Sequence, residues 1–175
     1  MHFLYMLTAI SIGLLPVSSF AQSEAGGYDI EGSNIVGTEI DQVGQWVIQE
    51  AFDGRKIAYC SGSYDHDRNN IRLGFDGGQW QLAIPVSNQK DWQGKLLIDG
   101  KGSGRGYGRG SESVSGTVSG GWTIVWLTLD HLDGLSKGRL ANLKTDPGGY
   151  DFPLINISTV ISKIKSCYET GKGNS

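Results

Sequence analysis

The segment with the most chemical potential is the glycine-rich tract GKGSGRGYGRG at positions 100–110. Arg105, Tyr107 and Arg109 alternate with glycines there, so backbone amides and guanidinium groups could together hold an anion. The tract lacks the Gly-Lys-Ser/Thr ending of a phosphate-binding loop and the third glycine of a dinucleotide fingerprint. A flexible surface loop explains the same pattern. We therefore take these three side chains as candidate binding residues only.

Acidic residues and histidines give weaker signals. The segment DHDRN at 65–69 imitates the start of a calcium loop, but Asn70 stands where that motif requires glycine, and a solvated turn is the favoured interpretation. His66 and His131 are far apart, and no cysteine is free to join them as a ligand. The sequence therefore predicts no metal site and no cofactor.

Nothing in the chain specifies catalysis. Asp130 and Asp133 flank His131, but a polar turn accounts for all three residues. The Gly-x-Ser-x-Gly elbow of serine hydrolases is absent from the sequence. Two carboxylates that meet only in the fold would still suit a glycosidase. We predict no catalytic residue and keep a carbohydrate-active hydrolase as an alternative.

Trp92 stands apart from the other four tryptophans because its surroundings, NQKDWQG at 88–94, are polar. An exposed tryptophan on a loop often marks a binding surface. The alternative is that this side chain folds back over the mouth of a barrel. The remaining tryptophans occupy apolar strand positions and are predicted to lie in the core: Trp46, Trp80, Trp122 and Trp126.

The N-terminal segment determines where the folded domain that carries these residues begins. An apolar run at 3–15, followed by Pro16 and the small residues Ser19 and Ala21, is typical of a signal peptide cleaved after Ala21. The run is too short to be a transmembrane helix. We therefore predict a signal peptide at 1–21, a flexible leader at 22–40, and no integral membrane segment after cleavage. A buried N-terminal strand or helix is the alternative for this segment.

Two cysteines, Cys60 and Cys167, remain after that cleavage and are predicted to form a disulfide. Two unpaired thiols are the alternative, and the lack of Cys-x-x-Cys disfavours redox activity. The net charge of −3 argues against nucleic-acid binding, although the Gly-Arg tract resembles RNA-binding tracts. Together these features predict a periplasmic or secreted protein.

Short alternating strands separated by Asp-Gly and Gly-Gly turns fill most of the remaining chain. The predicted strands are 44–52, 56–60, 71–75, 79–84, 95–99, 122–129, 140–145 and 149–152. A 3.6-residue period over 157–168 predicts a helix that Gly171 stops. Residues 131–138 are expected to form a single helical turn between strands.

The sequence thus predicts one mainly β domain at 41–170, followed by a disordered tail at 171–175. Its expected architecture is an antiparallel meander, either a sandwich or a partly open barrel. One C-terminal α-helix is disulfide-linked to an early strand.

Scattered landmarks resemble the secreted proteobacterial proteins related to the invasion-associated locus B family. They cover about 43–168 and comprise Trp46-Val47, Cys60, Trp80-Gln81-Leu82, 94–100, 138–140, 150–154 and the final helix with Cys167. The additional central cysteines of that family are missing here. The resemblance implies a periplasmic or surface β-rich protein involved in host-cell interaction, and it brings no catalytic residues.

The function expected from the sequence is that of an exported, non-enzymatic binding or accessory protein of the bacterial envelope. Its partner would be another envelope or host protein, contacted through a sheet edge or the Trp92 loop. A secreted inhibitor or immunity-type protein is the further alternative, beside the hydrolase.

Overall fold

A computed structural model describes residues 35–66, 69–85, 91–102, 113–119, 122–144 and 149–173. The predicted signal peptide lies outside these residues. The helices and strands are β1 (Ile35–Val43), β2 (Trp46–Asp53), β3 (Lys56–His66), β4 (Asn69–Phe75), β5 (Trp80–Pro85), β6 (Asp91–Ile98), β7 (Lys101–Gly102), β8 (Ser113–Ser119), β9 (Trp122–Leu127), α1 (Leu129–Lys137), β10 (Leu140–Lys144), β11 (Gly149–Pro153) and α2 (Ile157–Gly173). In these described ranges, no helix is long and apolar enough to cross a membrane.

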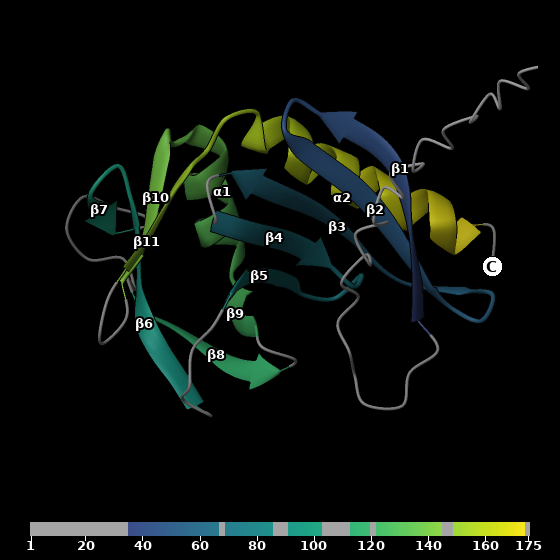
Figure 1. The fold of residues 1–175 in the computed structure, drawn as a ribbon, viewed down its shortest axis with the longest axis horizontal. Coiled ribbons are helices and arrows are strands. Elements are labelled where there is room, and N and C mark those ends of the chain that lie inside the picture. The colour runs from purple at the N-terminus through teal and green to yellow at the C-terminus, as the bar shows by residue number, and fades with distance from the viewer. Residues whose placement is uncertain are drawn as a thin grey trace, which may run out of the picture.

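All the strands join one antiparallel sheet that does not close into a barrel, in the order β1-β2-β3-β4-β5-β9-β8-β6-β10-β11, with β7 attached to β6. The mainly β, antiparallel prediction is therefore confirmed. The first five strands form a meander in chain order, whereas β6 pairs with β8 and β10 and does not pair with β5. The sheet curves strongly, so β6, β10 and β11 run across the direction of β3 and β4 (Figure 1).

Tight turns set the register of the hairpins. Gly54 has a φ of 62° in the turn between β2 and β3. Asp99 and Gly100 have φ values of 50° and 76°, as a two-residue type I′ turn requires. The Asp99 carboxylate also accepts hydrogen bonds from the backbone N–H groups of Arg139, at 3.1 Å, and Leu140, at 3.0 Å. These bonds tie the turn to the start of β10 and hold the pKa of Asp99 below its usual 3.8.

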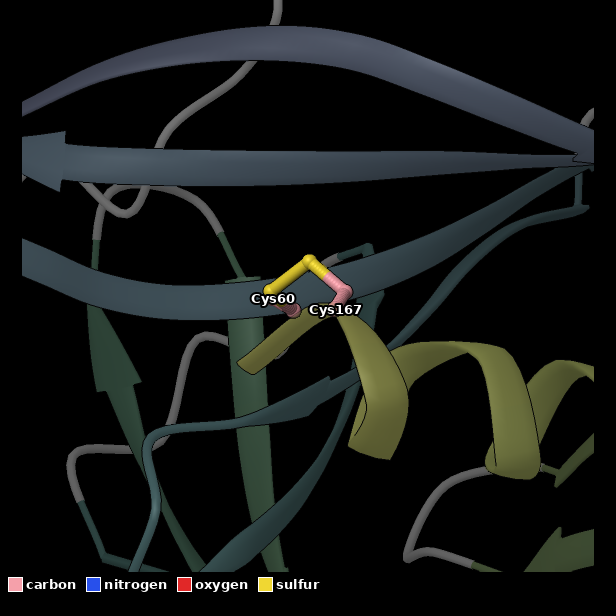
Figure 2. Close-up of a disulfide and its surroundings, with 2 residues drawn as sticks. All are labelled: Cys60 and Cys167. Atoms are coloured by element: carbon pink, nitrogen blue, oxygen red, sulfur yellow. A yellow bond between two sulfur atoms is a disulfide. The ribbon is translucent and has the colours of Figure 1, made fainter. Parts of the chain in front are cut away.

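Helix α2 packs against β2, β3 and β4, and its buried residues follow the predicted helical period: Ile157, Val160, Ile164, Cys167 and Gly171. Gly62 of β3 lets the helix approach closely, since a Cβ there would lie 2.8 Å from Val160 Cγ1. The Cys60–Cys167 disulfide joins β3 to α2, as predicted (Figure 2).

Gly171 does not stop α2, which continues to Gly173. A side chain at position 171 would collide with Ile57 of β3, so glycine is needed there for packing. The helix therefore extends into the segment 171–175 that the sequence predicts as a tail, because tertiary contact outweighs the low helix propensity of glycine.

A second helix, α1, replaces the single turn expected around His131. Thr128 caps it: its hydroxyl accepts a hydrogen bond from the backbone N–H of His131, and His131 Nδ1 accepts one from the backbone N–H of Thr128. This is a capping box with histidine in the place usually held by Glu or Gln. His131 is buried, and its ring caps the start of α1. Asp133 forms an ion pair with Lys137 on the surface of the same helix.

Three strands occupy segments where none was predicted, and the shortest of them is the two-residue β7, Lys101–Gly102. β1 begins at Ile35, within the segment 22–40 that the sequence predicts as a leader, and β8 spans Ser113–Ser119. β8 has only two apolar residues, and the four apolar residues of β1 do not alternate regularly with polar ones. Each is stabilised by pairing with its neighbours and not by a hydrophobic pattern of its own.

Candidate functional site

Among the described residues, the main path of paired strands ends at β1 and at β11, and these two edge strands differ in accessibility. β11 is five residues long, ends at Pro153, and its Asp151 is hydrogen-bonded to Asn142 of β10. β1 has nine residues and no proline, and within the described part of the chain it pairs with β2 alone. Short strands and prolines protect sheet edges from further pairing. β1 is therefore the edge better able to accept another strand.

A cleft of about 400 Å³ lies between this edge and α2, and we call it the edge cleft. Its apolar lining includes Ile40, Ile48 and Phe52 from β1 and β2, and Cys167 from α2. The cleft exists because α2 packs against β2, β3 and β4. The helix reaches β1 through Lys163, which lies near the middle of α2. Figure 1 shows α2 running along β2 beside β1.

One ion pair joins the two walls of the edge cleft. Lys163 Nζ of α2 lies 2.7 Å from the Asp41 carboxylate of β1, and both side chains are partly exposed. The Lys163 hydrogen bond, together with the backbone N–H of Gln42, holds the pKa of Asp41 below its usual 3.8. Asp41 is therefore ionised at neutral pH and already occupied by a cation.

This lowered pKa predicts a pH dependence of stability. Because the folded pKa of Asp41 lies below the unfolded value, its stabilising contribution is present above about pH 3.8 and is lost as the pH falls through the folded pKa. We expect Asp41→Asn to destabilise the protein at pH 7 and to have a smaller effect at pH 2.5. Thermal unfolding at both pH values measures this difference.

The exposed pair of Asp133 and Lys137 offers a matched control for that experiment. Asp133→Asn also removes an ion pair, but one that lies within a single helix and joins no separate elements. An equal loss for Asp41→Asn at both pH values would contradict the assignment.

Glu50 is the second carboxylate of the edge cleft. It lies on β2, pairs in register with Cys60 on one side and Thr38 on the other, and is half-buried. In the part of the chain that the structure describes, its carboxylate makes no hydrogen bond or ion pair. Asp41 and Lys163 cancel in charge, so the cleft carries a net charge of −1 that belongs to Glu50.

A second depression lies beside the start of α1, lined in part by Asp76, Trp80 and Leu129. The Asp76 carboxylate is already used, since one of its oxygens accepts hydrogen bonds from the backbone N–H groups of Gly78 and Gln79. Leu129 is 77% exposed at this place. The depression offers apolar surface but no available charge.

The outer face of the sheet holds two tryptophans that were predicted to be core. Trp122 and Trp126 are only partly buried and stand outside the main core cluster, because β9 presents Val125 and Leu127 to that cluster instead. Arg72 of β4 stacks on Trp122 at 5.0 Å. Trp46 and Trp80 do lie in the core, as predicted.

The predicted binding residues lie wholly or partly outside what the structure describes. Trp92 lies in β6 opposite Gly116 of β8, in a strand and not in the predicted loop; its side chain lies outside what the structure describes. Arg105, Tyr107 and Arg109 also lie outside the described residues. Among those that are described, no group of three or more His, Cys, Asp or Glu side chains could hold a metal.

The sequence does not reveal the edge cleft, because it predicts 35–40, the first six residues of β1, as part of a leader. The signal that could have found it is the set of β-branched residues between 35 and 43, namely Ile35, Val36, Thr38, Ile40 and Val43. Comparison with known proteins adds no further guide, since no family model, curated protein or solved structure matches the chain.

Proposed function

We propose that this chain is an exported, non-enzymatic binding or accessory module of the bacterial envelope, which contacts a protein partner through β1. The accessible edge of β1 beside the edge cleft carries this proposal, because an unpaired edge strand offers a row of backbone donors and acceptors to an incoming strand. The disulfide supports the compartment, since such bonds persist in oxidising environments.

The edge cleft contains two carboxylates, which is the feature that would suit a carbohydrate-active hydrolase. A glycosidase needs one of its carboxyl groups to hold a proton at working pH, through a raised pKa. The pKa of Asp41 is lowered and its carboxylate is paired with Lys163. This arrangement favours binding over acid catalysis.

Site-specific photo-crosslinking in the producing cell tests the proposal. A benzophenone amino acid replaces Thr38, which is exposed on β1, or Thr117, which is exposed inside the sheet on β8. Thr117 pairs with Asp91 of β6, so it reports on the part of the sheet that β6 and β8 form together. We expect one discrete protein adduct at Thr38 and none at Thr117.

Adducts at Thr117 alone would move the binding surface to the strand that carries Trp92. Adducts at neither position would reject a binding role for both surfaces. Cell fractionation, with the mass of the N-terminal peptide, checks export in the same cultures, and we expect the exported chain to begin at Gln22.

A further inference from the structure

We propose that the edge cleft binds an extended peptide segment that adds a strand to β1 and places a Lys or Arg side chain against Glu50. The inference rests on the proposed function and names the chemistry of its partner. It joins three observations on the described residues: β1 pairs with β2 alone among them, the cleft has an apolar floor, and the Glu50 carboxylate has no hydrogen bond or ion pair with any of them.

The geometry of β1 selects where the peptide would pair. A bulge between Glu39 and Asp41 interrupts the ladder, whereas Ile35 to Glu39 pair in unbroken register with Asp53 to Gln49 of β2. Bulges block regular pairing along an edge. The added strand would therefore lie along the 35–39 part of β1 and leave the ladder at Ile40, which is 43% exposed.

The register also explains why the recognised side chain is long. Thr38 stands directly across from Glu50, so a peptide residue beside Thr38 on the same face lies two strand spacings, roughly 10 Å, from Glu50. Lys and Arg have flexible stems that can cross a small residue such as Thr38 and bring a cation to the carboxylate. Their methylenes would pack against Ile48 and Phe52 on the way.

Electrostatics favours a cation over an anion at this place. Asp41 and Lys163 already neutralise each other, which leaves Glu50 as the net charge of the cleft. The cleft also borders the last two turns of α2, from Cys167 to Gly171, where the helix dipole is negative. Both contributions act in the same direction.

A second copy of the chain is a poorer occupant of the same edge. Pairing β1 with β1 would bring no cation to Glu50, because β1 (IVGTEIDQV) contains Glu39 and Asp41 but no Lys or Arg. Like charges on neighbouring strands destabilise pairing. Self-association is therefore expected to be weak. Analytical ultracentrifugation tests this alternative, and we expect it to show a monomer.

Fluorescence anisotropy with two labelled nine-residue peptides of alternating Thr and Val tests the inference on the exported full-length chain. One peptide carries a central Arg, and the matched peptide carries Glu at that position. We expect the Arg peptide to bind about five to ten times more tightly, with a difference that shrinks as salt is raised. Hydrogen exchange should slow at β1 amides when the Arg peptide is bound.

Substitutions then assign the preference to one residue. Glu50→Gln is expected to abolish the difference between the two peptides, and Glu50→Lys to reverse it. Glu39→Gln is the matched control, because it also removes an exposed carboxylate near Glu50. Glu39 pairs with Gln49, the residue before Glu50, so its side chain lies on the opposite face of the sheet from that of Glu50. Unchanged thermal unfolding verifies that each variant is folded.

A preference that persists in Glu50→Gln, or that disappears in Glu39→Gln, would overturn the inference. Dimer formation that competes with peptide would identify a second copy as the occupant and would also overturn it. If neither peptide binds while Thr38 still gives a crosslinked partner, the inference fails and the proposed function stands.

Discussion

Loss of the Cys60–Cys167 disulfide is expected to lower the free energy of unfolding by about 4–5 kcal/mol, because the bond closes a loop with a sequence separation of 107 residues. The reason is the entropy of the unfolded chain, which a bridge between distant residues restricts strongly. Small domains have a total stability of about 5–15 kcal/mol, so the reduced protein should be close to unfolding at 37 °C. Urea unfolding with and without a reductant measures the change.

Reduction of the wild-type chain is a better first experiment than substitution. Both cysteines are buried, so replacing them with alanine also removes packing atoms. The double variant Cys60→Ala/Cys167→Ala should therefore be no more stable than the reduced wild type. Equal urea midpoints for the oxidised and the reduced wild type would show that the bond contributes nothing.

Trp46→Ala is expected to destabilise the protein by about 3–5 kcal/mol, the usual range for truncating a buried large aromatic side chain. Trp46 is 1% exposed, and its ring centroid lies 5.2 Å from that of Tyr64. Its indole N–H donates a 3.0 Å hydrogen bond to the carbonyl of Ile155, just before α2. The side chain thus connects the beginning of β2 to the beginning of the helix.

Trp46→Phe separates the two contributions. Phenylalanine keeps most of the buried aromatic surface but cannot donate to the Ile155 carbonyl, so a loss of about 1 kcal/mol is expected. Trp126→Ala is a matched control, since Trp126 is only partly buried and lies outside the core cluster. A loss for Trp126→Ala as large as that for Trp46→Ala would contradict the assignment of the core.

Local patterns predicted the parts of the fold that have their own chemical signature. The Asp-Gly turn at 99–100, the helix over 157–168 and the pairing of Cys60 with Cys167 were all visible in the sequence. Each depends on a conformational or periodic preference that acts within a few residues, or on there being only two cysteines. These preferences survive in the folded protein because packing agrees with them.

The remaining parts depend on contacts that no local pattern contains. The insertion of β9 and β8 between β5 and β6 replaces the pairing of consecutive strands, and nothing near Pro85 signals it. Gly171 was interpreted as a helix stop, but the close approach of Ile57 explains it. The edge cleft lies where α2 passes beside β1, and the sequence does not predict β1 as a strand. Glu50 is therefore not recognisable from the sequence as a cleft residue.

The position of the disulfide also has a mechanical consequence. The covalent ring it closes contains β4 to β11 and α1, whereas β1 and β2 lie outside it. A force applied between the two ends of the chain can strip β1 and β2 from the sheet but cannot extend the ring. At about 3.3–3.6 Å per residue, reduction would release roughly 370 Å of additional chain length. A pull on β1 is thus borne by the β1–β2 hairpin, which lies outside the covalent ring.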